Sequence, residues 1–190
     1  MKWIKKNMTT ILLLLILLVG LSLLLYPTVS DYWNSLHQSR AIATYAQAVA
    51  EVDDKQYEHM WEDAYGYNQQ LKSKSNRWIM TDEEREEYES LLDVSDNGIL
   101  GYIEIPKIKV SLPIYHGTDE GILQIAVGHI EGSSLPVGGP GTHAVLSGHR
   151  GLPSAKLFTN LDELVVGDEF LIRVLDETLT YEVDQIRIVE

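Results

Sequence analysis

The sequence predicts a mainly β domain that is preceded by an α-helical extension and by an N-terminal transmembrane helix. Three observations support this prediction: a charge-free apolar window near the amino terminus, a long segment with helical spacing and no proline, and a carboxyl-terminal segment of short alternating strands and turns. The chain has 190 residues, a length that suits one domain with an extension rather than two full domains.

The transmembrane helix is predicted for residues 7–30, which carry no charged side chain. About 20 apolar residues are enough to cross the hydrocarbon core of a bilayer. Lys2, Lys5 and Lys6 precede the window, so residues 1–6 are expected in the cytoplasm and the rest of the chain outside the cell. The alternative is a cleaved signal peptide, but its apolar stretch is usually shorter and is followed by a small-x-small cleavage site. We expect a single-pass anchor in the cell membrane.

Charge and composition exclude several classes of function. The net charge is −13, which argues against nucleic acid as a partner because neutralising phosphates requires a basic surface. The 190 residues contain no cysteine. This excludes disulfide bonds, cysteine-ligated zinc and a cysteine nucleophile within the sequence.

Residues 31–97 are predicted to form the helical extension. Apolar and aromatic residues recur there at helical spacing, which indicates two helices hinged near Asp53 and Asp54. Thr81 and Glu84 fit a capping box that opens a short third helix. Residues 93–98 are rich in turn formers and mark the boundary of the next domain. Trp78 stands between two polar stretches, and it either plugs a groove or packs at the start of the helix.

Residues 98–190 are predicted to be a β-rich domain. Strands are expected at residues 101–106, 111–115, 142–147, 169–175 and 179–189, with a turn at 176–178 between the last two. Residues 122–130 are expected to begin as a helical turn and then become extended, and residues 154–161 to form a helical turn. This spacing suggests a barrel or a sandwich. A last strand that runs to Glu190 would expose an unpaired edge, so either the sheet closes differently or the chain is incomplete.

His149 is the candidate catalytic residue. An apolar strand runs into a corner of small residues, Ser147-Gly148-His149-Arg150-Gly151, which leaves the imidazole at the rim of the domain. A general acid/base needs such a position because its pKa must stay near the working pH. The residue pattern alone is equally compatible with a strand-end histidine bonded to the backbone.

Other chemistry is less well supported by the pattern. A zinc site at His129, His143 and His149 lacks helical i, i+4 spacing and has no carboxylate within residues 142–153 to orient a ligand. Ser147 and Ser154 are weak nucleophile candidates because neither lies in a Gly-x-Ser-x-Gly elbow. No metal site and no cofactor are predicted.

Five motifs in order resemble the sortases, and most closely the class C, pilus-building subfamily. They are Gly101-Tyr102-Ile103-Glu104-Ile105-Pro106, Leu112-Pro113-Ile114-Tyr115, Gly128-His129-Ile130-Glu131-Gly132-Ser133-Ser134-Leu135-Pro136, Ser147-Gly148-His149-Arg150-Gly151-Leu152-Pro153 and Leu157-Phe158-Thr159-Asn160-Leu161-Asp162. The resemblance covers residues 98–190. It implies an eight-stranded β-barrel on a Gram-positive surface, and a membrane-anchored cysteine transpeptidase that cuts Leu-Pro-x-Thr-Gly-type signals. The partners it implies are pilin or surface proteins that carry such a signal, and the acceptor lysine of a pilin.

The resemblance places the catalytic histidine at His149, and it matches His129 and His143 to flanking, non-catalytic positions. The family's cysteine and arginine lie on two strands beyond the point where the sequence ends, and Arg150 and Arg187 do not occupy the arginine motif. We therefore expect a partial barrel, inactive by itself, from a truncated enzyme. A degenerate, non-catalytic binding module and a sortase of another class that anchors proteins to the cell wall are the alternatives. Class C members often carry an Asp-Pro-aromatic lid, and residues 75–80 with Trp78 stand in its place.

Overall fold

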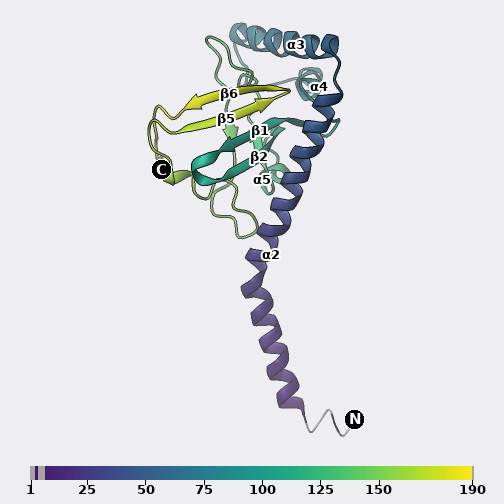
Figure 1. The fold of residues 1–190 in the computed structure, drawn as a ribbon, viewed down its shortest axis with the longest axis vertical. Helices are drawn as coiled ribbons and strands as arrows, with labels where there is room; N and C mark the ends of the chain where they lie inside the picture. Colours follow the sequence, from purple (N-terminus) through teal and green to yellow (C-terminus); the bar gives the residue numbers. More distant parts are fainter. Residues whose placement is uncertain (1–2, 4–6, 190) are drawn as a thin grey trace.

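The computed structural model describes residue 3 and residues 7–189, and Figure 1 shows a long helix with a β-sheet beside its upper half. The helices are α2 (Met8–Glu51), α3 (Asp54–Ser73), α4 (Asp82–Ser90) and α5 (Glu120–Leu123), with 3-10 turns at Pro106–Ile108 and Leu161–Glu163. The strands are β1 (Ile99–Ile105), β2 (Val110–His116), β3 (Val127–His129), β4 (Leu146–Ser147), β5 (Glu169–Val174) and β6 (Glu177–Glu182). The predicted cytoplasmic tail, residues 1–6, lies outside the described residues except for Trp3.

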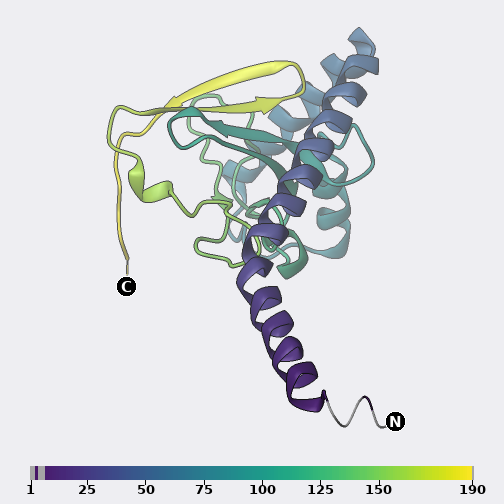
Figure 2. The same cartoon turned by 60° about the horizontal axis from the view of Figure 1, so that its bottom comes forward.

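The predicted membrane span and the first helix of the extension form one continuous helix, α2, of 44 residues. Pro27 lies inside it and removes one backbone donor without ending the helix. Among the described residues, α2 is the one helix long and apolar enough to cross a membrane, with a window of mean hydropathy 2.8 that is wholly unburied. This half of α2 extends away from the sheet (Figure 2).

Local capping signals set the helix boundaries. The predicted hinge near Asp53 is confirmed, since α2 ends at Glu51 and the Asp53 side chain caps α3 by accepting a hydrogen bond from the Gln56 amide at 2.9 Å. The predicted capping box is also confirmed. The Glu84 amide donates to the Thr81 hydroxyl at 3.2 Å, and the Thr81 amide donates to the Glu84 carboxylate at 2.9 Å.

The strands form one six-stranded sheet in the order β4-β3-β2-β1-β5-β6. Every neighbouring pair is antiparallel except β2–β3, which is parallel. Inward residues of the central strands, such as Ile103, Ile114 and Ile172, join Tyr88 of α4 and Ala64 of α3 in one apolar core. The prediction of a mainly β fold with a helical extension is confirmed.

Three predicted elements differ from the structure. Only Leu146–Ser147 of the expected strand 142–147 forms ladder pairs. The expected strand 179–189 ends at Glu182, and its turn is Leu175–Asp176 rather than 176–178. The expected helical turn at 154–161 is shifted toward the carboxyl terminus: residues 157–160 form a turn, and a 3-10 helix follows at Leu161–Glu163. Residues 184–189 have strand-like alternation, but no described strand pairs with them and Ile188 is 95% exposed.

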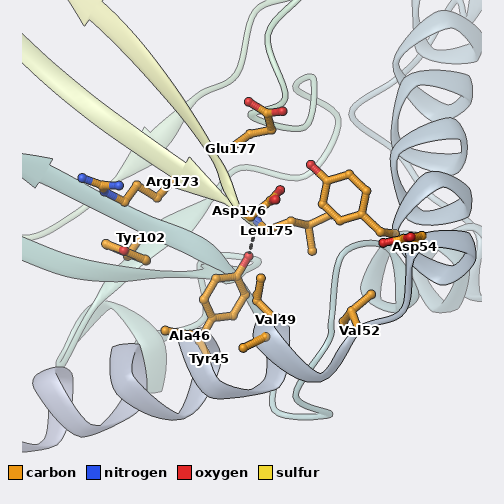
Figure 3. Close-up of a pocket in the computed structure, with 12 residues that line it drawn as sticks. Tyr45, Ala46, Val49, Val52, Asp54, Tyr102, Arg173, Leu175, Asp176 and Glu177 are labelled. Carbon is orange, nitrogen blue, oxygen red and sulfur yellow. Dashed lines mark hydrogen bonds between the residues drawn. The ribbon is translucent and has the colours of Figure 1, made fainter.

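Tyr45 fastens α2 to the sheet. Its side chain is fully buried, and its hydroxyl donates to the Leu100 carbonyl at 3.1 Å and accepts from the Leu175 amide at 2.7 Å. Burial raises the pKa of this phenol well above its ordinary value. The same tyrosine lines a pocket of about 520 Å³ between α2, the start of α3 and the β5–β6 turn (Figure 3). No histidine lines this pocket, so it is separate from the predicted catalytic residue.

Replacing Tyr45 by phenylalanine is expected to lower the free energy of unfolding by about 1–3 kcal/mol, because a buried amide and a buried carbonyl lose their partner. Urea unfolding of the whole chain in mild detergent measures this change. Tyr65→Phe is the matched control, since that ring is 45% exposed. Equal stability of the two variants would contradict the fastening role of the Tyr45 hydroxyl.

Candidate functional site

The candidate site lies where β4 ends and the chain turns toward His149. β4 pairs with β3 through Gly128–Ser147 and His129–Leu146. Before β4, serine hydroxyls take over half of the pairing: the Val145 amide donates to the Ser133 hydroxyl and the His143 amide to the Ser134 hydroxyl, both at 3.1 Å. The carbonyls of the same two residues still accept backbone amides, from Ile130 at 2.9 Å and from Ser134 at 3.0 Å. This substitution explains why the predicted strand 142–147 is mostly irregular, although its backbone is still held against the segment that follows β3.

Phe158 fixes the backbone on both sides of His149. A Cβ placed on Gly148 would lie 2.7 Å from Cδ2 of Phe158, so the ring packs directly on the glycine backbone. The Phe158 amide also donates to the His149 carbonyl at 3.1 Å. Phe158 is only 7% exposed, whereas His149 is half-buried. The result is an imidazole on a constrained backbone that solvent can still reach, which suits a group that exchanges protons.

His129, next to β4, has a structural role. Its ring is fully buried, with Nδ1 2.8 Å from the Tyr88 hydroxyl and Nε2 2.8 Å from the Ser134 carbonyl oxygen. A carbonyl can only accept, so Nε2 carries the proton and Nδ1 accepts from Tyr88. Burial lowers the pKa of His129 to about 4. The ring is therefore held neutral at physiological pH.

The zinc interpretation of the three histidines is not supported. Within the described part of the chain no group of three or more histidine, aspartate or glutamate residues is placed to hold a metal ion. His129 already uses both ring nitrogens, and His143 is exposed on the irregular segment before β4. The three residues share a stretch of sequence but not a coordination sphere.

The other chemically active side chains are engaged elsewhere. Arg150 pairs with Asp162 at 3.0 Å on the surface, and Arg187 donates to the Gln185 side chain at 3.0 Å. Ser147 is half-buried in β4, and the carbonyl of Ser154 accepts from Asn34 at 2.8 Å. In residues 7–189 neither of these serine hydroxyls is hydrogen-bonded to a histidine, so neither has the base that a serine nucleophile needs.

Trp78 lies against the turn that follows β3. Its ring is 57% exposed, and the guanidinium of Arg77 lies 4.9 Å from the ring centroid. A Cβ on Gly132 would lie 2.3 Å from the Arg77 carbonyl oxygen and 3.0 Å from the Trp78 ring, so only glycine fits there. Gly132 follows the end of β3, whereas His149 follows the end of the antiparallel β4. Trp78 and His149 therefore stand at opposite ends of this strand pair.

Tyr88 and Phe158 were not predicted as site residues. Tyr88 lies on α4, donates to His129 and accepts from the Gly117 amide at 3.1 Å, so it ties the helical extension to β2 and β3. Phe158 acts from nine residues beyond His149. The apolar Leu157-Phe158 pair in a polar loop was the one available signal, and it does not reveal which backbone the ring covers.

The sheet and the strand-end histidine agree with a known domain family. Residues 103–190 match the family model described as the sortase domain. Sortase C1 from Streptococcus agalactiae is 51% identical, with a TM-score of 0.74 over 78% of this chain and 77% of that one. The chain therefore belongs to the sortase family, whose members are cysteine transpeptidases.

The similar solved structures are class C sortases. A second is sortase C of Streptococcus pneumoniae, which is 41% identical with a TM-score of 0.67 over 77% of this chain and 74% of that one. Among curated proteins, sortase D of Bacillus subtilis (strain 168) is 38% identical over 90 residues. That match covers 47% of this chain and 42% of the Bacillus protein, so the chain aligns with less than half of that relative.

Proposed function

We propose that this protein is a class C sortase that joins pilin subunits outside the cell, with His149 as its general acid/base. The observation that carries the proposal is the half-buried imidazole at the end of β4, held by Phe158 on both sides, in a chain 51% identical to a sortase C1. The substrates are surface proteins with a Leu-Pro-x-Thr-Gly-type signal, and the acceptor is a pilin lysine.

The proposed reaction has two steps. A cysteine thiolate attacks the threonine carbonyl, a C–S bond forms, the Thr–Gly C–N bond breaks, and the imidazolium of His149 gives its proton to the departing glycine amine. The lysine amine then attacks the thioester, His149 takes its proton, and the thiolate leaves as an isopeptide bond forms. The sequence contains no cysteine, so the proposal requires the thiol, and an arginine for the oxyanion, from residues that follow Glu190.

The proposed orientation places the sheet on the outer side of the membrane. Lys2, Lys5 and Lys6 precede the apolar half of α2, and positive charge flanking a span stays in the cytoplasm. Asp31 is the first charged residue after the span. The acidic domain that follows would then meet secreted precursor proteins and not nucleic acid.

The coding sequence beyond Glu190 gives the first test. A Thr-Leu-x-Thr-Cys-like strand, followed about ten residues later by arginine, is expected. The complete product, incubated with a sorting-signal peptide and a pilin lysine acceptor, is expected to yield a thioester and then an isopeptide by mass spectrometry. A stop codon after Glu190 would instead support a non-catalytic, membrane-tethered binding module. Transfer to cell-wall peptide amines, and not to pilin lysine, would assign the enzyme to another sortase class.

Residues 75–80 are proposed as a lid, and Trp78→Ala tests this. The Trp78 ring packs on the Gly132 turn of the domain, and losing about 1 kcal/mol of this packing is expected to increase the fraction of open lid and to raise hydrolysis of a sorting-signal peptide by up to about fivefold. Tyr65→Ala, which removes an exposed aromatic side chain from α3, is the control and is expected to leave turnover unchanged. Equal turnover for Trp78→Ala and the parent enzyme would make Trp78 a packing residue.

A further inference from the structure

The loop that follows His149, residues 150–160, is fastened to α2 and is called here the post-histidine loop. The Lys156 amide donates to the Asp31 carboxylate at 2.9 Å, and the Lys156 ammonium lies 3.4 Å from the same carboxylate. The Asn34 side chain donates to the Ser154 carbonyl at 2.8 Å. These contacts join residues more than 100 positions apart. In Figures 1 and 2 the loop reaches α2 where the helix leaves the domain.

The attachment points lie at the end of the apolar span. The uncharged window ends at Ser30, and with a rise of 1.5 Å per residue Asn34 is only about 6 Å farther along the axis. The headgroup layer on each side of a bilayer is roughly 5–7 Å thick, which is the difference between the full thickness and the hydrocarbon core. If α2 spans the membrane, Asp31 and Asn34 hold the loop at the level of the outer headgroups.

The side chains around these contacts suit that level. Tyr32 and Trp33 are 65% and 63% exposed, and aromatic rings of this kind favour the membrane interface. Asp31 and Lys156 neutralise each other, so this pair adds no net negative charge that would repel anionic headgroups.

The same loop is coupled to His149. Two residues after Lys156, the Phe158 amide donates to the His149 carbonyl, and the Phe158 ring packs on Gly148. A short and mostly buried segment, Ala155 to Phe158, therefore connects the α2 contacts to the backbone of the candidate catalytic residue. A shift of Lys156 would be transmitted to the position of His149.

We propose that the post-histidine loop and the first exposed turn of α2 form a membrane-contact surface, in which Asp31 and Asn34 are positioning residues that set the height of His149 above the outer leaflet. The occupant of this surface is the headgroup layer of a phospholipid bilayer. The claim that the height of His149 matters for catalysis rests on the proposed function, whereas the contact of this surface with lipid does not.

The lack of cysteine makes site-specific labelling simple. Ser154→Cys places a single thiol on the loop, and Glu62→Cys places one on α3, at the far end of α2 from the span (Figure 1). Each variant of the 190-residue chain, in which the introduced thiol is the only one, is labelled with an environment-sensitive fluorophore and reconstituted in phosphatidylcholine–phosphatidylglycerol vesicles that contain headgroup nitroxide lipids. We expect strong quenching at position 154 and little at position 62. Equal quenching at the two positions would overturn the proposal.

Variants of α2 test the positioning role. Asp31→Ala with Asn34→Ala is expected to abolish most of the quenching at position 154 and to raise hydrogen exchange in residues 150–160. Asp31→Asn keeps an oxygen that accepts from the Lys156 amide and is expected to retain the quenching. Gln47→Ala is the control. Gln47 lies farther along α2 toward α3, and in the described structure its side chain hydrogen-bonds only to Glu51. Unchanged quenching in the double variant would overturn the roles of Asp31 and Asn34.

The two proposals can fail separately. The depth measurement needs no catalysis, so loss of the quenching pattern removes the membrane-contact surface and leaves the transpeptidase proposal intact. Conversely, a complete enzyme without pilin-joining activity would remove the catalytic proposal, while strong quenching at position 154 would still establish the contact with lipid.

Discussion

Replacing His149 by alanine in the complete enzyme is expected to lower the rate of pilin joining by roughly 10²–10⁴-fold, the usual contribution of a general acid/base. Without the imidazole, the departing glycine amine receives no proton and the incoming lysine amine loses none. The thioester should also form more slowly, because a neighbouring imidazolium favours the thiolate. A gel assay of covalent pilin polymer, together with peptide cleavage kinetics, measures the effect.

The matched control is His143→Ala, which removes an exposed histidine six residues earlier in the chain. It is expected to keep nearly full activity. Both variants should unfold at the parent midpoint, since the His149 ring is half-buried and Phe158 holds the backbone through main-chain and ring contacts. Undiminished polymer with His149→Ala would refute the assignment.

The stability of the fold is expected to fall by about 3 kcal/mol between pH 6.5 and pH 4 through His129 alone. In the folded chain burial lowers the pKa of His129 to about 4, whereas an unfolded histidine titrates near 6.5. Within this window the unfolded state binds the proton and the folded state does not. The stabilisation is therefore complete above pH 6.5 and is lost progressively as the pH falls to 4.

Urea unfolding of the chain in mild detergent at several pH values tests this expectation. His129→Gln removes the titrating ring and is expected to flatten the pH dependence, although the variant is less stable overall. Some slope remains, because burial also lowers the pKa of His116. His59→Ala, which removes an exposed histidine paired with Asp63, keeps the parental slope. If the free energy of unfolding of His129→Gln depended on pH as steeply as that of the parent, the buried His129 ring would not be the main source of the pH dependence.

Features set by neighbouring residues were predictable. The hinge near Asp53, the capping box of Thr81 and Glu84, and the cores of β1, β2 and β5 follow from side chains within a few positions of one another. The sequence did not predict that the membrane span and the first helix of the extension continue as one helix, α2, through Pro27. In an apolar helix one lost donor is a smaller penalty than ending the helix, because every other backbone group must still find a partner.

Features set by distant residues were not predictable. The hydroxyls of Ser133 and Ser134 replace part of the pairing between β3 and the segment before β4. Nothing in the sequence of residues 142–147 indicates that these serines interrupt its pairing. Likewise, Tyr88 reaches His129 across 41 positions, and Asn34 reaches Ser154 across 120. The catalytic role of His149 stays a prediction that rests on the resemblance, and the support of its backbone by Phe158 depends on how a loop folds back onto a strand end.

The α2 side chains that hydrogen-bond to the domain lie on one face of the helix. Asp31, Asn34, Gln38 and Tyr45 are separated by three, four and seven positions, so they form a single stripe on the helix. Inserting one residue between Gln38 and Tyr45 would rotate the two ends of this stripe by about 100° and separate them by about 1.5 Å, whereas inserting seven would restore their direction and lengthen the gap by about 10 Å. The residue count of this stretch of α2 thus fixes the register between the loop and the sheet.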